Sequence, residues 1–456
     1  MIWQPRPGSS ESVARAVDGV HVGPVRALAG VGTDSREDCT GGLFVALVGP
    51  RFDGHAHVGE ALAKGAAAAL VRRGRGQEAA TRIEVEDTTA ALGRLGRSAR
   101  RTSSATVFGL TGSNGKTSSK ELLAGLLEAI GRGPCHRTPG NLNNAIGLPM
   151  TLLGLGEHRS AVIEMGMNAP GEIDELTRLC EPDVVLVLNV GPAHIGRLGS
   201  LEAIAEAKGE AFRAAPQDAI RVANADDPRV MAQLEASGHS GLSYGWSPRA
   251  HIRIAERSPF PGGQSVRFHE PDLVIELPWA GAHQASNAAA AVACCVAAGL
   301  ELPSRVDLRA QLAPLSGRGA RLRRGPWTIV DESYNANPAS TEAALRAVIE
   351  EAGESPVMLL MGAMGELGAH GERGHAKVGQ RAAELGVAFV GTLGEGAEAT
   401  AAAAAAAGVP SHHEREDAEA LQSQAEAVLD DRPWWILVKG SRASRMERFA
   451  QRLGAA

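Results

Sequence analysis

Aromatic side chains make up only 4% of this 456-residue sequence, and it contains only five cysteines. With so few rings available, the hydrophobic cores must be built from Ala, Val, Leu and Ile. The cysteines are odd in number and lack CxxC spacing, so they offer no disulfide framework. The adjacent Cys294 and Cys295 lie among alanines, a setting that favours small buried residues.

Long apolar runs are also missing. The most apolar stretch, residues 288–300, is shorter than the ~18 residues that a membrane-spanning helix needs. Residues 1–10 contain Pro5, Pro7 and Gly8 instead of the apolar run of a signal peptide. We therefore expect a cytoplasmic protein with reduced cysteines and no membrane span.

Positive charge is not in surplus. Lys and Arg number 46 against 52 Asp and Glu, which gives a formal net charge of −6. A protein whose main partner is a nucleic acid would normally present a dominant basic face. The composition therefore argues against nucleic acid as the main partner.

The sequence does contain a repeated alternation of strand-length apolar runs and helix-length segments. This order is typical of parallel sheets with right-handed crossovers, and the length is about three times that of a domain of roughly 150 residues. Breaks at Thr102–Ser104 and Pro314–Ala320 divide the chain. We predict three α/β domains, residues 1–103, 104–316 and 317–456.

The strongest chemical signal is the segment Thr111-Gly-Ser-Asn-Gly-Lys-Thr117, which lies between a predicted strand and a predicted helix. Glycines let backbone N–H groups converge on phosphate oxygens, and the helix N-terminus adds a positive dipole end. Lys116 is placed to neutralise the terminal phosphates and Thr117 to hold Mg²⁺. The general phosphate-loop pattern has glycine where this chain has Leu110, so the loop is a variant.

Two further polar residues follow neighbouring strands. Glu164 ends the next apolar strand, and His194 follows the one after it. Carboxyl ends of parallel strands meet at one edge of a sheet, where ligands bind. Glu164 is thus a candidate Mg²⁺ ligand. A lone histidine after a strand is more often structural, but three strands delivering polar groups to one edge favour a functional His194.

These residues resemble the Mur ligase family, the ATP-dependent amide-forming enzymes of peptidoglycan synthesis. The phosphate loop looks like that family's T-G-x-N-G-K-T, and Ala205–Glu210 looks like its A-x-x-K-x-E segment. The resemblance implies a central phosphate-loop ATPase domain with a parallel sheet. It also implies a small α/β N-terminal domain and a Rossmann-like C-terminal domain on either side.

The family's lysine in that second segment is carbamylated by CO₂, which makes Lys208 a ligand of a second Mg²⁺ ion. Taken alone, Lys208 on an amphipathic helix would be a solvated surface lysine. The implied metal ligands are therefore Thr117, Glu164, His194 and carbamylated Lys208. The implied catalytic residues are Lys116, His194, Lys208 and Arg318.

The resemblance also assigns the ATP site. His283–Asn287 is similar to a family motif whose Asn contacts adenine, although Asn287 would otherwise pass as a helix-start residue. Gly317–Gly319 resembles the family's boundary motif, whose Arg reaches the ATP phosphates, and Arg318 could otherwise be a linker charge. The implied ATP-binding residues are Gly112, Ser113, Asn114, Gly115, Lys116, Thr117, Ser118, Asn287, Arg318 and Asp331, the last on the ribose.

Two amide-rich segments indicate the branch of the family. Thr138–Thr151 and Asp331–Pro338 look like those of ligases that add D-Ala-D-Ala to UDP-N-acetylmuramoyl-tripeptide. Glu332 stands where such ligases have a second Asp, and the D-N-P-R motif of the preceding ligase is missing. The implied substrate-binding residues here are Asn141, Asn143, Asn144, Tyr334, Asn335 and Asn337.

The first domain is similar to the portion of these ligases that holds the UDP end of the substrate. Ser35, Arg36, Asp53 and His55 are the corresponding residues. His55-x-His57 has no third metal ligand nearby, so His55 is predicted to stabilise a turn or to contact substrate. In the last domain, Gly362–Gly368 is not a GxGxxG motif, and we predict no dinucleotide site there.

The implied reaction passes through an acyl phosphate, with ATP, two Mg²⁺ ions and the Lys208 carbamate, in a protein expected to be a monomer. A folylpolyglutamate synthase-like or other ligase of the same fold would not need the uridine-binding residues. A nucleotide-dependent switch would have no use for residues 141–144 and would need a guanine-reading N-K-x-D motif, which is missing. An inactive relative would not retain every phosphate and metal group.

Overall fold

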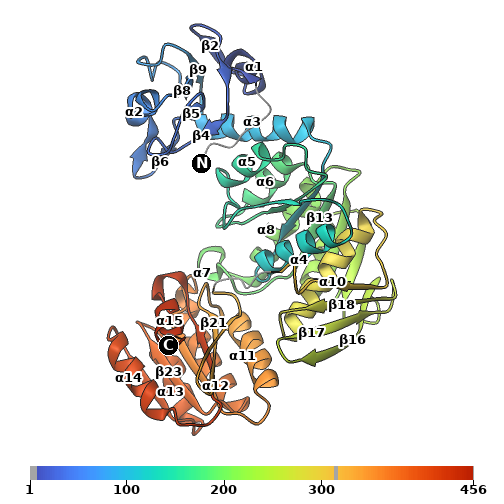
Figure 1. Ribbon diagram of the computed structural model, residues 1–456, viewed down its shortest axis with the longest axis vertical. Helices are drawn as coiled ribbons and strands as arrows, with labels where there is room; N and C mark the ends of the chain where they lie inside the picture. Colours follow the sequence, from blue (N-terminus) through green and yellow to red (C-terminus); the bar gives the residue numbers. More distant parts are fainter. Residues whose placement is uncertain (1–7, 313–316, 455–456) are drawn as a thin grey trace.

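Three sheets follow one another along the chain, and the computed structural model describes residues 8–312 and 317–454. Figure 1 shows them along the long axis of the molecule, from the blue N-terminal part to the orange and red C-terminal part. The α/β architecture with parallel sheets is as predicted. The predicted boundary at 316/317 falls beside Pro314–Ser316, which lie outside the described residues.

The N-terminal part has a five-stranded sheet in the order β2-β9-β8-β5-β4. All pairs are parallel except β2 with β9. Short β1–β3 and β6–β7 pairs flank it. The strands are β1 (Gly8–Ser9), β2 (Val20–Val22), β3 (Ala27–Leu28), β4 (Val31–Gly32), β5 (Leu43–Val45), β6 (Val48–Gly49), β7 (Phe52–Asp53), β8 (Ala68–Arg72) and β9 (Arg82–Val85), and the helices are α1 (Ser10–Ala16), η1 (Gly54–His57), α2 (Val58–Ala63) and α3 (Thr88–Thr102).

The central part has a ten-stranded sheet in the order β11-β12-β10-β13-β14-β15-β16-β17-β18-β19. Its first seven strands pair in parallel, and β16, β17 and β18 form an antiparallel meander. The strands are β10 (Thr106–Thr111), β11 (His136–Arg137), β12 (Ser160–Glu164), β13 (Val184–Val187), β14 (Ile220–Asn224), β15 (Gly241–Gly245), β16 (Ile252–Phe260), β17 (Gly263–Phe268), β18 (Leu273–Leu277) and β19 (Arg305–Asp307). The helices are α4 (Lys116–Ala129), α5 (Gly147–Leu153), α6 (Glu172–Cys180), α7 (Ile195–Leu198), α8 (Leu201–Ala214), α9 (Pro228–Ala236) and α10 (Ala282–Ala297).

The C-terminal part has a six-stranded sheet in the order β20-β21-β25-β22-β23-β24, parallel except for β20 with β21. The strands are β20 (Ala320–Arg324), β21 (Trp327–Glu332), β22 (Val357–Gly362), β23 (Phe389–Leu393), β24 (Ser411–Glu414) and β25 (Trp435–Lys439). The helices are α11 (Pro338–Ala352), η2 (Gly368–His370), α12 (Gly371–Glu384), α13 (Glu398–Ala406), α14 (Ala418–Val428), η3 (Arg442–Ser444) and α15 (Glu447–Gly454).

Small aliphatic residues build the core, as the scarcity of rings predicts. In α10 the run from Ala288 to Cys295 is buried, and it includes both predicted buried cysteines. Glycine takes the same role where α3 crosses α5, because a Cβ on Gly96 would lie 2.7 Å from the Cα of Pro149. No helix in the described ranges is long and apolar enough to cross a membrane.

Helix α3 also joins the N-terminal part to the central part through charge. Arg97 and Arg101 both contact the Glu181 carboxylate, at 2.6 and 2.7 Å, and Arg100 contacts Asp183 at 2.9 Å. Arg100 is only 9% exposed, so its ion pair is shielded from water more than an ordinary surface pair. The first two sheets are thus held together by packing and by a shared ion-pair cluster.

The C-terminal part contains a buried histidine whose ring nitrogens are both engaged. His375 Nε2 accepts a hydrogen bond from the backbone N–H of Met364 at 3.0 Å, and Nδ1 lies 2.9 Å from Thr400 Oγ1. Burial lowers the pKa of His375 to about 4. The neutral ring therefore fixes the loop that follows β22.

We predict that this histidine makes stability pH-dependent. An unfolded histidine has a pKa of about 6.5, so the unfolded chain takes up a proton that the folded chain refuses. The free energy of unfolding is therefore unaffected by His375 above pH 6.5, and it falls by about 2–3 kcal/mol as the pH drops towards 4. Thermal unfolding at pH 7.5 and 5 should show a shallower dependence for His375→Gln than for the wild type. A control, His239→Gln, should keep the wild-type slope, and equal slopes for all three proteins would contradict the assignment.

Candidate active site

The carboxyl ends of the second and third sheets face a shared cavity of about 520 Å³. Its wall combines the loops after β10, β11 and β13 and the end of β12 with the loop after β21 and the end of β25. The predicted site residues that line it are Ser113, Asn114, Gly115, Lys116, Thr117, Ser118, Asn141, Asn143, Glu164, His194, Asn287, Arg318, Tyr334, Asn335 and Asn337. The structure therefore brings together most of the residues predicted for ATP, metal and substrate.

The phosphate loop turns sharply into α4 because Gly115 adopts a left-handed conformation, with φ of +82°. A Cβ at this position would lie 2.6 Å from Asn287 Oδ1, so only glycine fits. The turn starts the helix at Lys116. Lys116 and Thr117 thereby occupy the first helical turn, where free N–H groups favour anions.

The loop is held by the segment after β13. Asn189 Oδ1 accepts a hydrogen bond from Asn114 N at 2.9 Å, and Asn189 Nδ2 donates to Asn114 O at 3.0 Å. Ser113 Oγ donates to Gly191 O at 3.0 Å and accepts from Gly191 N at 2.8 Å. Asn189 is not among the predicted site residues, although it comes five residues before His194 at the same edge of the sheet.

A carboxylate and a hydroxyl meet beside the loop. Glu164 Oε2 accepts a hydrogen bond from Thr117 Oγ1 at 3.1 Å, and Oε1 accepts from Asn143 Nδ2 at 2.8 Å. Glu164 is 3% exposed. Oxygen donors of this kind, one carboxylate and one hydroxyl, suit Mg²⁺ bound together with phosphates.

Two lysines carry buried ammonium groups near this point. Lys116 Nζ donates to Gly112 O at 2.7 Å, and burial lowers the pKa of Lys116, while the Glu164 carboxylate opposes that shift. Burial also places the pKa of Lys208 well below its usual value, with the charge of Lys116 as a second cause. Lys208 is only 2% exposed, so the prediction of a solvated surface lysine is wrong. Among the described residues it has no hydrogen-bond or ion-pair partner.

The third domain supplies an arginine and an aromatic ring. The Arg318 guanidinium lies 3.9 Å from the centroid of the Tyr334 ring, a cation–π geometry. The turn before it depends on Asp331, whose Oδ2 accepts from Gly317 N at 3.2 Å and whose Oδ1 accepts from Ser333 Oγ at 2.5 Å. Asp331 is buried beneath the turn and does not line the cavity, so its contact with ribose stays a prediction.

Asn337 joins the third domain to the phosphate loop. Its Oδ1 caps α11 by accepting from Ser340 N at 2.9 Å, and its Nδ2 donates to Asn114 Oδ1 at 2.7 Å. Asn335 lies two residues earlier in the same loop, and its carbonyl accepts from Lys439 Nζ at 3.0 Å. Lys439 also lies 3.4 Å from Glu332 Oε2 and is almost fully buried.

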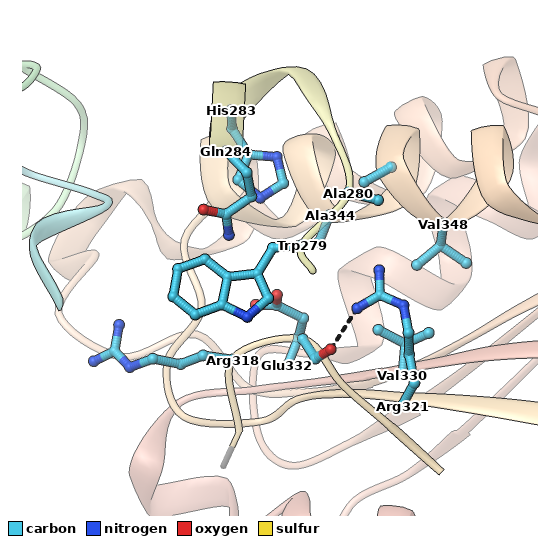
Figure 2. A pocket seen from close by; sticks show the side chains of 12 residues that line it. Trp279, Ala280, His283, Gln284, Arg318, Arg321, Val330, Glu332, Ala344 and Val348 are labelled. Carbon is cyan, nitrogen blue, oxygen red and sulfur yellow. Dashed lines mark hydrogen bonds between the residues drawn. The ribbon is translucent and has the colours of Figure 1, made fainter. Parts of the chain in front are cut away.

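The far end of the cavity is formed by α10. Asn287 Nδ2 donates to Gln284 Oε1 at 3.0 Å, and Asn287 Oδ1 accepts from Ser119 Oγ at 3.2 Å. Figure 2 shows a smaller adjoining cavity of about 20 Å³, in which the Trp279 ring lies between α10 and Glu332. It is too small for a nucleotide, so the space for a ligand is the larger cavity.

Some predicted residues lie elsewhere. Asn144 accepts from Gly147 N at 2.8 Å at the start of α5, and it does not line the cavity. Ser35 Oγ donates to Glu60, and Arg36 pairs with Asp34. The Ser35, Arg36, Asp53 and His55 side chains belong to the N-terminal part and do not line the cavity, so their contacts with substrate stay predictions.

His55 has the geometry of a turn-stabilising residue. Its Nδ1 lies 2.6 Å from Asp53 Oδ1, and its Nε2 accepts from Arg72 N at 2.9 Å. Hydrogen bonds from His55 lower the pKa of Asp53 to about 2. Both ring nitrogens are engaged, so the ring fastens the β7 turn to β8.

Three segments of the chain match family models. Residues 27–100 match "Mur ligase family, catalytic domain", residues 110–295 match "Mur ligase middle domain", and residues 317–442 match "Mur ligase, glutamate ligase domain". Each match lies within one predicted domain, while the boundaries at 103/104 and 316/317 stay predictions.

The chain is 36% identical over 438 residues to the UDP-N-acetylmuramoyl-tripeptide–D-alanyl-D-alanine ligase of Escherichia coli K12, covering 93% of each protein. Its fold is similar to a MurF crystal structure from Acinetobacter baumannii, with a TM-score of 0.90 and 32% identity, over 99% of this chain and 100% of that one. It is also similar to Thermotoga maritima MurF in complex with ADP, with a TM-score of 0.82 and 28% identity, over 93% and 96% of the two chains.

The close approach of Gly115 and Asn287 predicts that Gly115→Ala weakens ATP binding by at least about tenfold, because either the loop or Asn287 must move. Gly131→Ala is the matched control. Gly131 has a similar φ of +78°, but a Cβ there would meet nothing within 4 Å. The control should lose about 1 kcal/mol of stability and keep wild-type affinity in calorimetric titrations with ATP. Equal affinities for the two variants would contradict the fit.

Proposed function

The chain belongs to the Mur ligase family, and on that premise we propose that it joins D-alanyl-D-alanine to UDP-N-acetylmuramoyl-tripeptide while ATP is converted to ADP and phosphate. The observation that carries this proposal is the meeting of Lys116, Thr117 and Glu164 with the Tyr334–Asn337 segment in one cavity. Lys116, Thr117 and Glu164 suit the phosphates of ATP and their metal ion. The Tyr334–Asn337 segment comes from the third domain, which is proposed to close on them. Such a ligase for a peptidoglycan precursor works in the cytoplasm.

The reaction begins with the carboxylate at the peptide end of the UDP-linked substrate. It attacks the γ-phosphorus of ATP in line, forms an acyl phosphate and releases ADP. Lys116 and Arg318 neutralise charge on the phosphoryl oxygens, since both line the cavity as cations. The phosphate loop amides at the start of α4 orient the β- and γ-phosphates.

The amine of D-Ala-D-Ala then attacks the acyl carbon. A tetrahedral intermediate forms, an amine proton is lost, and inorganic phosphate leaves as the amide bond is completed. Asn141, Asn143, Tyr334, Asn335 and Asn337 are proposed to orient the two peptide substrates, because amide and phenol groups match peptide carbonyls and N–H groups. No protein nucleophile is needed, so the residues serve to position the substrates and to exclude water.

We propose that Mg²⁺ binds beside the phosphate loop. Thr117 and Glu164 provide oxygens that already contact each other, and His194 lines the same cavity. Within the described residues no three of His, Cys, Asp and Glu gather, which fits a cation held mainly by phosphates and water. Bound there, Mg²⁺ supplies positive charge to the phosphoryl oxygens.

Lys208 fits the proposed carbamate. Carbamylation requires a neutral amine, which attacks CO₂ and loses a proton to give the N-carboxylate. Burial lowers the Lys208 pKa, and no carboxylate in the described residues restores the ammonium form. The new carboxylate would convert an expensive buried cation into an oxygen ligand for a second Mg²⁺ ion.

Ser35, Arg36, Asp53 and His55 are proposed to serve the UDP end of the substrate, and Asp331 and Asn287 the ribose and adenine of ATP. The runner-up function, a folylpolyglutamate synthase-like ligase, has no use for the N-terminal residues. A monomer remains our expectation for the oligomeric state.

Steady-state ADP release tests the proposed function. Wild-type protein should release ADP continuously only when UDP-N-acetylmuramoyl-tripeptide and D-Ala-D-Ala are both present with ATP and Mg²⁺. Lys116→Ala should lower that rate by about 10²–10³-fold without unfolding, because it removes a charge that stabilises the transition state. Near-normal turnover by the variant, or turnover by the wild type that ignores either peptide substrate, would overturn the proposal.

Lys208 gives a separate prediction. Lys208→Ala should lose about 10²-fold or more of its activity and regain part of it with added formate or acetate, which supply the missing carboxylate. Lys377→Ala, at an exposed position in α12, is the control and should behave as the wild type with and without these anions. Full turnover of Lys208→Ala in CO₂-depleted buffer would rule out the carbamate.

A further inference from the structure

The loop after β22 reaches from the third domain to the turn that carries His194. Glu366 Oε2 lies 2.7 Å from His194 Nδ1, although the pair is not aligned as a hydrogen bond. The Glu366 carbonyl accepts from Gly196 N at 2.9 Å. In Figure 1 the short helix α7 lies between the central part and the third sheet. Glu366 thus contacts the second domain with both its side chain and its backbone.

The contact is close enough to demand glycine on both sides. A Cβ on Gly196 would lie 2.6 Å from Gly368 N and 2.8 Å from Glu366 O. A Cβ on Gly368 would lie 2.8 Å from Gly196 Cα. Because the obstructing atoms are backbone, neither side can yield by rotating a side chain. The two loops can meet in this way only when the third domain is fully seated.

Both partners of the pair are strained. His194 has φ of +63° and Glu366 has φ of +64°, the left-handed region that non-glycine residues rarely adopt. Such a conformation brings Cβ too close to the backbone and is unfavourable for any residue with a side chain. Strain of this kind persists where the surroundings impose it, commonly at sites of function. Here the two strained residues touch each other.

Charge connects the pair to the phosphate loop. His194 is the largest cause of the lowered pKa of Glu366, and Lys116 contributes in the same direction. Glu366 in turn acts on Lys116. The carboxylate of the third domain therefore lies within electrostatic reach of the lysine at the start of α4. The position of this carboxylate therefore affects the electrostatic potential where the phosphates are proposed to bind.

We infer that Glu366 is a positioning residue for His194, and that the Gly196–Gly368 contact makes this positioning depend on closure of the third domain. The Glu366 carboxylate lies beside Nδ1 and can fix the orientation of the imidazole, which lines the cavity. A histidine held by a carboxylate is more rigid than a free one. This inference rests on the proposed function, because it assigns His194 its task there.

Three variants distinguish the backbone contact between the two loops from the action of the Glu366 side chain on His194. Gly196→Ala keeps every functional side chain but blocks the backbone contact, and Gly371→Ala is its control, since a Cβ at Gly371 meets nothing within 4 Å. Glu366→Ala removes the carboxylate and keeps the backbone contact. Glu366→Gln keeps an oxygen that can accept from His194.

Nucleotide binding and shape are measured first, by calorimetry with ADP and Mg²⁺ and by small-angle X-ray scattering. The wild type, Gly371→Ala and both Glu366 variants should become more compact with nucleotide, whereas Gly196→Ala should not. ADP affinity should stay within about threefold of wild type in Gly371→Ala and both Glu366 variants, whereas Gly196→Ala should bind ADP more weakly because its closure is blocked. Compaction of Gly196→Ala equal to that of its control would overturn the role of the contact. These readouts need no peptide substrate, so they hold even if the proposed function fails.

Turnover then tests the side chain. Glu366→Ala should lower kcat by about 10–100-fold with little change in the KM for ATP, and Glu366→Gln should recover part of the loss. In a His194→Ala background, Glu366→Ala should have almost no further effect. An unchanged kcat in Glu366→Ala, or an equal loss in both backgrounds, would overturn the positioning role. Absence of wild-type turnover with the tripeptide substrate would instead count against the proposed function.

Discussion

The arrangement of the site depends on one residue of the phosphate loop, Asn114. Its backbone N–H and carbonyl are both bound by the Asn189 side chain, and its own side chain accepts from Asn337 on the third domain. These bonds use the N–H and carbonyl of Asn114 to hold the loop in place, and the N–H groups at the start of α4 remain to meet phosphate. The external amide of Asn189 provides that support, and Asn337 extends it to a second sheet. The geometry of the phosphate site and the position of the third domain are therefore linked through a single asparagine.

Positive charge is concentrated at the cavity. The protein has a net charge of −6, yet its cavity and the buried region behind it hold Lys116, Arg318 and Lys208. Burial disfavours the ammonium form of both lysines, and the phosphates proposed to bind beside Lys116 would stabilise its charged form. The same burial makes the empty site electrostatically unfavourable and an anionic ligand favourable. Mild overall acidity and tight phosphate binding are thus compatible, because the cations are few and confined.

The sequence was sufficient to predict what depends on local pattern. Gly115, Lys116 and Glu164 follow strands whose ends must share an edge, and the alternation of elements predicts the three parallel sheets. The same edge rule, applied to the loop after β22, would have drawn attention to Glu366, because this loop leaves the carboxyl end of a parallel strand. Residues whose role depends on distant contacts could not be found in this way. The burial of Lys208, the bridge from Asn337 to Asn114 and the place of Asp331 beneath Gly317 all require the packed structure.

The central claim is that nucleotide at the phosphate loop and the position of the third domain are coupled through Asn114 and Asn337. Hydrogen–deuterium exchange of segments 111–119 and 334–342, with and without ADP and Mg²⁺, tests it most directly. The account predicts that ADP protects both segments in the wild type and protects only segment 111–119 in Asn337→Ala. If ADP fails to protect segment 334–342 in the wild type, or protects it equally in Asn337→Ala, the coupling is contradicted.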